Sequence, residues 1–318
     1  MKLTNLAIIF SLIAASLFTI INIRVNHLSV VVQNNIEYNK RVDSAVDDGV
    51  MNLVEVDSNR EIHLNKDKAV EQFYTSLYVN FGVIGDSIKE KQLQTYIPII
   101  LITYMDGYYI YYTDTYESNG EILTCRRWTE KLPYSFQDDR FIYSFTLSEE
   151  VIIYDKETNA VKKGNYHDLS LNYPDTILVD DSKFDLERRN AIIGSIEDSM
   201  RYYVNRYNHI ANQFGITYQF FLPQIDQTDW YRTIDDISML VIFQGYSYGT
   251  IGLDTYNRFS IGGARINKIS NYYVELDVNG KEYYHKSDCN SVIFTSRPYD
   301  TKEECALEGA YPCPNCNP

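Results

Sequence analysis

Hydrophobic residues dominate the first part of the chain without interruption. The stretch from Leu3 to Ile23 carries no charge and consists mostly of Leu, Ile, Ala and Phe. At a rise of about 1.5 Å per residue, a helix of this length just crosses a hydrocarbon core of about 30 Å. We therefore expect a single transmembrane anchor over residues 1–24, in contact with membrane lipid.

A cleaved signal peptide is the alternative for this segment. The small residues at positions 14–16 suit a signal peptidase, but the apolar run continues beyond them to Ile21, which favours an uncleaved anchor in a cell membrane. Basic residues lie on both sides, with Lys2 before the segment and Arg24 after it, so charge does not decide the orientation. We place the body outside the cytoplasm because so few residues precede the segment, and a cytoplasmic body is the alternative.

Beyond the anchor the pattern changes from continuous to periodic. Apolar side chains recur mostly every three or four residues, at Leu28, Val32, Ile36, Val42, Val46, Val50 and Leu53. This helical period, with no proline to break it, predicts one helix that leaves the bilayer and continues as a stalk over residues 25–58. Gly49 costs such a helix about 1 kcal/mol without ending it. If the stalk contacts other chains, Val42→Asp or Val46→Asp should break complexes and leave the body folded.

The same stretch resembles the N-terminal spine of pilin-like and TadE-like proteins, in which a hydrophobic helix runs into an amphipathic one. The matching features are the anchor, Asn34-Asn35 and the sequence VDSAVDDG at residues 42–49. The chain departs from type IV prepilins because it lacks their glycine-Phe-x-x-x-x-Glu processing site. The resemblance implies a role in an envelope assembly. A helix that only lifts the body off the membrane is the plainer alternative.

The centre of the chain contains runs of β-forming residues with turn signals between them. Two such runs flank Met105-Asp106-Gly107, which predicts a hairpin over residues 97–116, because Gly accepts the positive φ of a tight turn. A second strand pair is expected across residues 140–154, with a turn near residues 155–159. Further strands are expected at residues 218–222 and 272–276.

Helical stripes alternate with these strands. They predict a helix over residues 66–81 and a long helix over residues 186–214, where Gly215 follows as a C-cap signal. A third helix is expected to begin at Thr228 or Asp229 and to run to about Phe243. The fold class is therefore α+β: an antiparallel, hairpin-rich sheet packed with helices, forming a body over residues 59–278.

Patterns that would indicate catalysis are incomplete. Residues 245–249 fit G-x-S-x-G, but the glycine-rich segment that follows does not suit the required helix, and the one later histidine is His285. Neighbouring acids such as Asp235-Asp236 diverge on a helix or a strand, so they do not form a carboxylate pair. No P-loop, Rossmann glycine pattern or H-E-x-x-H is present. We expect no catalytic or organic-cofactor site and no enzyme activity.

The last thirty or so residues hold most of the candidate chemistry. His285-x3-Cys289 is followed by Cys313-x2-Cys316, and four Cys and His ligands close a tetrahedral structural zinc site. Between the pairs, residues 301–307 read as a short helix with a capping box. We predict a zinc-binding module over residues 279–318, stabilised by the ion because so short a segment cannot build a sufficient core.

This arrangement resembles the small zinc-binding module of the Ada type, with ligand spacing, helix and the approach GAYPC at residues 309–313 in common. In that module four cysteines bind the ion, and the first accepts a methyl group from DNA phosphate. Here His285 takes the place of that cysteine. The resemblance therefore implies the fold and a structural zinc, without the repair chemistry.

Two alternatives for the cysteines stay open. In an oxidising compartment, Cys125 with Cys305, or Cys289 with Cys305, can form a disulfide, although neither pairing explains a histidine at ligand spacing. Cys305 can also replace His285 as the fourth zinc ligand.

The composition of the chain limits the kinds of partner that it is expected to bind. The net charge of −14 disfavours nucleic acid, because an acidic surface repels phosphate backbones. The 29 tyrosines suit half-buried strand faces and interfaces, since one end of the side chain is apolar and the other forms hydrogen bonds. We expect a structural or assembly component of a bacterial envelope machine, of the pilus, secretion or conjugation kind, with protein partners. The alternative is an extracytoplasmic ligand-binding or sensing subunit that acts with a membrane partner.

Overall fold

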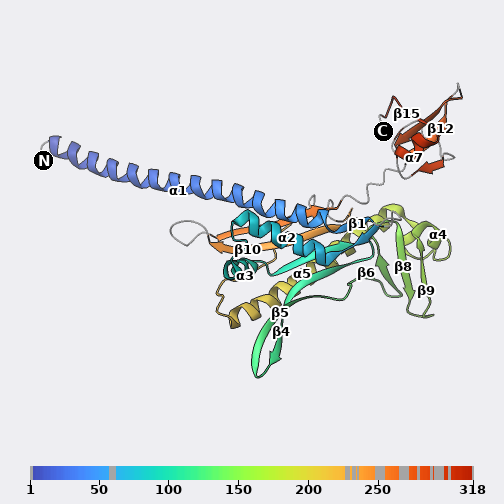
Figure 1. Cartoon of the computed structure of the whole chain (residues 1–318), viewed down its shortest axis with the longest axis horizontal. Helices are drawn as coiled ribbons and strands as arrows, with labels where there is room; N and C mark the ends of the chain where they lie inside the picture. The colour runs from blue at the N-terminus through green and yellow to red at the C-terminus, as the bar shows by residue number, and fades with distance from the viewer. Residues whose placement is uncertain are drawn as a thin grey trace. The chain divides into compact units, whose positions relative to one another are not determined.

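The fold was analysed in a computed structural model (Figure 1). It describes residues 3–56, 62–225, 230, 234, 236–247, 255–264, 272–277, 280–286, 289, 297–299 and 302–316. The chain divides into two compact units, Met1–Ala264 and Arg265–Pro318. The second unit begins before the border predicted at residue 279, because strand β12 (Tyr272–Leu276) pairs with strands of that unit. The class is α+β, as the sequence predicts.

The first unit begins with one long helix, α1 (Leu3–Met51). Among the residues that the structure describes, α1 is the one helix long and apolar enough to cross a membrane; a signal sequence has the same length and composition. Two of its hydroxyl groups are satisfied within the helix, since Ser16 Oγ donates to the Leu12 carbonyl at 2.8 Å and Thr19 Oγ1 to the Ala15 carbonyl at 2.9 Å. Polar side chains paired in this way are compatible with lipid.

Helix α1 is followed by the other elements of the first unit. Its helices are α2 (Lys66–Phe81), α3 (Ser87–Gln94), α4 (Tyr166–Ser170), η1 (Ile177–Val179) and α5 (Asp181–Gln213). Its strands are β1 (Val54–Val56), β2 (Ile62–Leu64), β3 (Ile99–Tyr104), β4 (Gly107–Ser118), β5 (Glu121–Trp128), β6 (Tyr134–Gln137), β7 (Phe141–Phe145), β8 (Glu150–Asp155), β9 (Val161–Asn165), β10 (Ser238–Ser247) and β11 (Thr255–Gly263).

Two antiparallel sheets organise these strands. The larger has the order β11-β10-β3-β4-β5, and the smaller is the meander β6-β7-β8-β9. Helices α1 and α2 pack together, and α1 also lies on β10 and β11. Helix α5 contacts both sheets, through β3 and β4 of the larger and β6 and β7 of the smaller. The core of the body therefore forms between the sheets and these three helices.

The C-terminal part of α1 belongs to this core and is not a separate stalk. Val42 and Val46 are 0% exposed. A Cβ at Gly49 would lie 3.0 Å from the Ala69 carbonyl of α2, so the glycine permits the close approach of the two helices. The expectation that Val42→Asp or Val46→Asp leaves the body folded is therefore wrong, because each would bury a carboxylate among apolar side chains.

A polar cluster also fixes α1 to the sheet. Asp43 accepts two hydrogen bonds from Arg258 of β11, at 3.1 and 2.7 Å, and a third from the Ser260 hydroxyl at 2.7 Å. One helical turn earlier, Asn39 accepts a hydrogen bond from Tyr256 at 2.9 Å. A bidentate pair of this kind sets orientation as well as proximity. The helix thus leaves the body in a defined direction.

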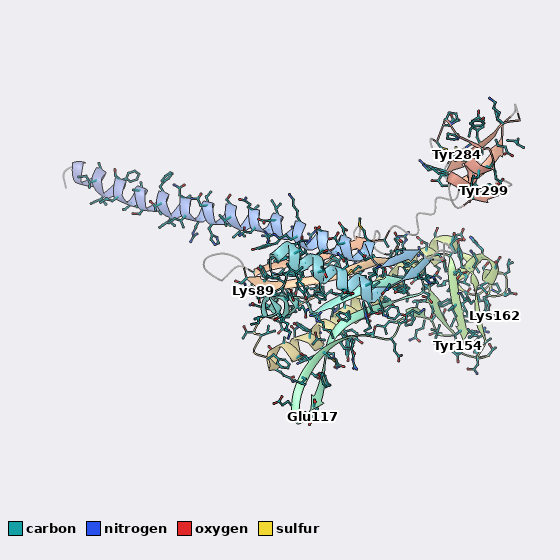
Figure 2. All side chains as sticks on the ribbon, in the orientation of Figure 1. Lys89, Glu117, Tyr154, Lys162, Tyr284 and Tyr299 are labelled. Carbon is teal, nitrogen blue, oxygen red and sulfur yellow. The ribbon has the colours of Figure 1, made fainter. Side chains whose placement is uncertain are left out.

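Before about Tyr38 the helix has few neighbours. Figure 2 shows its side chains projecting away from the ribbon in this part. Leu28 and Val32 are 61% and 55% exposed, and Ile36 is exposed as well. The periodic apolar stripe is thus divided into an exposed N-terminal part and a buried C-terminal part.

Other predictions for the body had mixed outcomes. The hairpin at Met105-Asp106-Gly107 is confirmed as β3 and β4, and the helix over residues 66–81 is α2. The strand at residues 218–222 is wrong, since that segment has no regular structure. The third helix is confirmed in part, because Trp230 and Ile234 are helical, but its extension to Phe243 is wrong because residues 238–247 form β10; its expected start lies outside the described residues.

Several tyrosines have a ring buried in the core and a hydroxyl group that donates a hydrogen bond to a polar group, as their amphipathic structure suggests. Tyr108 donates to the Ser195 carbonyl of α5 at 2.7 Å, and Tyr134 donates to the Tyr104 carbonyl at 3.0 Å. Burial raises the pKa of the Tyr104 phenol to about 12, because the charged form loses its hydration. Such phenols stay neutral and hold adjacent elements together.

Candidate metal centre

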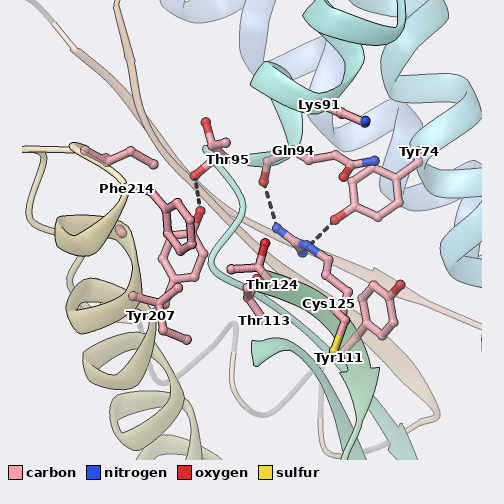
Figure 3. Close-up of a pocket in the computed structure, with 14 residues that line it drawn as sticks. Tyr74, Lys91, Gln94, Thr95, Tyr111, Thr113, Thr124, Cys125, Tyr207 and Phe214 are labelled. Atoms are coloured by element: carbon pink, nitrogen blue, oxygen red, sulfur yellow. Dashed lines mark hydrogen bonds between the residues drawn. The ribbon is translucent and has the colours of Figure 1, made fainter. Parts of the chain in front are cut away.

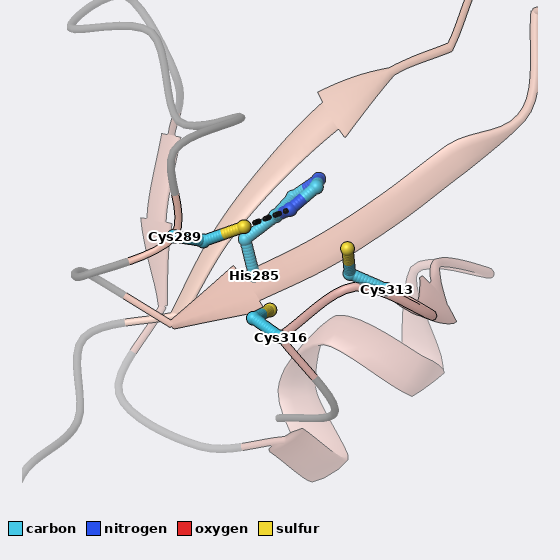
Figure 4. Close-up of side chains that lie close together, drawn as sticks. All are labelled: His285, Cys289, Cys313 and Cys316. Atoms are coloured by element: carbon cyan, nitrogen blue, oxygen red, sulfur yellow. Dashed lines mark hydrogen bonds between the residues drawn. The ribbon is translucent and has the colours of Figure 1, made fainter.

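The second unit is a small sheet with one short helix. It contains β12, β13 (Glu282–Lys286), β14 (Arg297–Tyr299), α7 (Lys302–Leu307) and β15 (Tyr311–Pro312), and the strand order is β14-β12-β13-β15. The helix predicted over residues 301–307 is thus present as α7. The unit presents one histidine and three cysteines on one side (Figure 4).

Cys305 is separated from this group by its place in the core. It is 0% exposed and packs with Tyr272, Val274, Tyr284 and Ala310. This core is very small, which agrees with a unit that needs another source of stability. The position of Cys305 argues against its replacing His285 as a ligand. All five cysteines are described, and none forms a disulfide.

The first ligand pair lies at the end of β13. His285 is opposite Tyr273 of β12 in the antiparallel register, and its side chain is buried. The chain then turns, with the Cys289 N–H donating to the Lys286 carbonyl at 3.0 Å. The turn brings Cys289 Sγ to 3.4 Å from His285 Nδ1. The three residues between His285 and Cys289 in the sequence thus correspond to the end of a strand and one tight turn.

The second pair is positioned by the pairing of β15 with β13. These strands are parallel, and the Cys313 N–H donates to the Tyr284 carbonyl at 3.0 Å. Cys313 is therefore fixed beside His285. The Asn315 N–H points to Cys313 Sγ at 3.4 Å, and the following turn returns Cys316 to the group. Backbone N–H groups directed at a cysteine sulfur stabilise its thiolate form. The sequence alone does not reveal this hydrogen bond, since any residue supplies the N–H.

The four ligand atoms have the separation that one metal ion requires. Those of His285, Cys289, Cys313 and Cys316 all lie within 4.8 Å of one another. In a tetrahedral site with metal–sulfur bonds of about 2.3 Å, the ligand atoms are about 3.8 Å apart. The observed separations include this value, since 4.8 Å is their upper limit and His285 Nδ1 lies 3.4 Å from Cys289 Sγ. Within the described part of the chain, this is the one such group of His, Cys, Asp and Glu ligands.

Electrostatics couples metal binding to protons at this cluster. Burial raises the pKa of the Cys316 thiol, and hydrogen bonds with Cys289 and Cys313 raise it further, because adjacent sulfurs cannot all carry charge. A divalent cation reverses this preference, since it binds thiolate sulfur. Binding at the cluster therefore releases protons, and its affinity falls as the pH falls.

The pattern G-x-S-x-G does not form a comparable site. Gly245 has φ of 80° and lies at a bulge in β10, after which the pairing with β11 continues through Tyr246 and Ser247. The segment after Ser247 lies outside the described residues. The downstream histidine that such a site needs, His285, belongs to the metal cluster.

Comparison with known proteins gives no relative for this chain. No family model, no curated protein and no solved structure matches it. Its function is therefore argued from the arrangement of its own residues.

Proposed function

We propose that the chain is a membrane-anchored structural component of an envelope assembly, of the bacterial pilus, secretion or conjugation kind, and not an enzyme. Helix α1 is the observation that carries this proposal. One element contains both the apolar segment and the buried residues Val42, Val46 and Val50 of the body. A continuous helix fixes the distance and direction of the body relative to the membrane, as a structural subunit requires.

In this proposal the apolar segment is an uncleaved anchor, with the body outside the cytoplasm. The helix runs without a break through the small residues at positions 14–16, so nothing in its geometry separates a leader from the mature chain. Protease added to intact cells should then digest the body, and a protected body would contradict this placement. Nucleic acid has no role in the proposal, in accord with the net charge of −14.

The exposed stripe of α1 is the contact surface we propose for assembly. Leu28 and Val46 are five turns of about 3.6 residues apart, and so are Val32 and Val50, so both pairs lie on one face. The body covers Val46 and Val50, whereas Leu28 and Val32 are exposed. Val32 lies about 13 Å beyond Ile23 along the helix, outside the predicted hydrocarbon span. We infer that this face packs against the same helix of a neighbouring subunit.

The metal cluster has a structural role in this proposal. We propose that its ion is zinc, because three thiols and one imidazole at tetrahedral separation form a typical zinc ligand set. Four protein ligands leave no position for a substrate. The ion would hold β13, β15 and the Cys289 turn together, and the second unit would serve as a small docking or bracing module.

An acidic substitution on the exposed stripe tests the assembly role. We expect Val32→Asp to reduce high-mass complexes in mild detergent extracts by about tenfold or more, because burying one carboxylate in an apolar contact costs about 2 kcal/mol or more. Gln33→Asp is the matched control, since it adds the same charge to an adjacent exposed position off the stripe. Complexes that survive equally in both variants would contradict the proposal, provided that both bodies unfold at the wild-type temperature.

A second function is favoured by a specific feature of the body. A cavity of about 520 Å³ lies against β4 and β5. This size is within the range of small-molecule sites. It supports the alternative of an extracytoplasmic ligand-binding subunit that acts with a membrane partner.

A further inference from the structure

The cavity lies where the larger sheet is incomplete (Figure 3). Strand β3 pairs with β4 only as far as Tyr112, and beyond this residue β4 pairs with β5 alone within the described part of the chain. The end of α3 and the end of α5 occupy the place of the missing strand. Tyr207 of α5 donates to the Thr95 carbonyl at 2.7 Å and joins these two walls.

The lining of this cavity has a charge opposite to that of the whole protein. It includes two cationic residues, Lys91 and Arg126, and no Asp or Glu. The chain as a whole has 43 acidic residues and a net charge of −14. A cavity that excludes carboxylates in so acidic a protein is suited to an anion.

Arg126 is held in place without being neutralised. It donates to the Tyr74 hydroxyl at 2.8 Å, the Gln94 carbonyl at 2.8 Å and the Ile97 carbonyl at 2.6 Å. All three acceptors are neutral, and among the described residues no carboxylate pairs with Arg126. The next residue differs, since Arg127 forms an ion pair with Asp114, which also pairs with Arg206.

These hydrogen bonds leave part of the guanidinium group available. They use three of its five N–H groups. The free donors are Nε–H and one Nη1–H, because both Nη2–H groups already donate. A carboxylate can therefore accept single N–H groups from a guanidinium whose position is already fixed. Lys91 is exposed at the rim and, in the described structure, has no ion-pair partner. It can add a second positive charge.

The opposite wall is apolar and partly open. Figure 3 shows Tyr207 and Phe214 on the side away from Lys91 and Tyr74. Ile210, Ala211 and Ile216 complete this wall, and Phe214 is 52% exposed at its edge. The hydroxyls of Thr113 and Thr124 lie between the two sides. A ligand that fits such a cavity has an anionic end and an apolar body.

We propose that this cavity binds a small organic carboxylate with an apolar or aromatic body. The carboxylate contacts Arg126 and Lys91, and the body of the ligand packs against the end of α5. The site is independent of the metal centre and of the exposed stripe of α1. The binding activity is additional to the proposed assembly role, and each of the two proposals can be contradicted without affecting the other.

Calorimetric titration of the full chain in lipid nanodiscs tests this assignment, with empty nanodiscs as the blank. The probe is 3-phenylpropanoate, and its neutral amide is the matched control. We expect a Kd below about 1 mM for the acid and at least tenfold weaker binding of the amide, a difference of about 1.4 kcal/mol. Inorganic phosphate should bind more weakly than the acid. No binding of the acid, equal binding of the amide, or preferred binding of phosphate would overturn the proposal.

Variants locate the binding. Lys91→Gln should weaken binding of the acid about threefold or more, whereas Lys89→Gln should not change it. Lys89 is a neighbour on the same helix and already pairs with Asp86 at 3.0 Å. Arg126→Lys keeps the charge but loses the planar group whose three hydrogen bonds fix its position, so it should weaken binding about tenfold or more. If both lysine variants bind as the wild type does and Arg126→Lys folds and also binds normally, the site lies elsewhere.

Cys125 supplies a readout that needs no substitution. Cys125 is among the residues that line the cavity and is partly exposed. Saturating 3-phenylpropanoate should slow its alkylation severalfold, measured by mass spectrometry of the peptide that contains it, and the amide should not. An unchanged alkylation rate in the presence of bound acid would overturn the location, even if Arg126→Lys fails to fold.

Discussion

Val46→Asp is expected to abolish the folded state of the body. Val46 is 0% exposed and lies where α1 meets β11: a Cβ on Gly262 would come within 3.0 Å of Val46 Cγ1. The same Cβ position lies 3.0 Å from Val50 Cγ2 and 3.4 Å from Asp47 Oδ1, so an introduced carboxylate would meet an apolar side chain and an existing acid. An unpaired buried charge costs about 4 kcal/mol or more, which is comparable with the lower end of the roughly 5–15 kcal/mol by which domains are stable.

Two measurements test the loss of the folded body: thermal unfolding of the full chain, and hydrogen exchange of peptides from the body. Ser44→Asp is the matched control, because Ser44 is exposed on the same turn region of α1 and should tolerate the same charge. We expect wild-type exchange protection in the control and loss of protection throughout α2, β10 and β11 in Val46→Asp. A folded Val46→Asp body would show that α1 is a dispensable stalk after all.

Cys316→Ser is expected to unfold the second unit and to leave the body intact. Among the residues of this unit that the structure describes, the buried apolar cluster comprises Tyr272, Val274, Tyr284, Cys305 and Ala310, with Tyr299 packed against it. Structural zinc contributes about 10 kcal/mol or more of apparent binding free energy at neutral pH, which is more than so small a core provides. The loss of one of four ligands should therefore remove the ion and the fold of this unit together.

Metal content and hydrogen exchange provide the two measurements. The wild-type chain, purified under reducing conditions, should carry about one equivalent of zinc, and Cys316→Ser less than half an equivalent. Peptides from residues 272–286 and 302–316 should lose protection in the variant only. Cys125→Ser removes a cysteine outside the cluster and should retain the ion. A wild-type chain with less than half an equivalent, or a protected unit in Cys316→Ser, contradicts the structural zinc.

Local signals explain what the sequence could predict. Helix α2 begins and ends where predicted because Asn65 caps its first turn and Gly82, at φ of 67°, accepts the left-handed conformation that ends it. The hairpin at Gly107 follows from its turn residues. The ligand group of the second unit could be predicted because its spacing reflects single tight turns, each of which brings two nearby residues into one cluster that could hold a metal ion.

Tertiary context explains what the sequence could not predict. Residues 239–243 are all buried and apolar, and such a run has no period by which to distinguish a strand from a helix. In the sequence, the apolar stripe of α1 has the same period throughout. Its C-terminal part is buried against β11, which lies about 200 residues later in the chain, whereas its N-terminal part is exposed. The cavity around Arg126 combines three distant segments, so no local pattern in the sequence indicates it.

The contact made by the exposed face of α1 in its own membrane tests the assembly role most directly. A photo-crosslinking residue placed at Val32 in intact cells, with Gln33 as the matched position, would record what lies against the stripe. We predict a discrete crosslinked product from position 32, whose crosslinked peptide comes from the same helix of a second subunit, and much less product from position 33. Crosslinks to lipid alone, or an uncrosslinked monomer from both positions, would contradict the account.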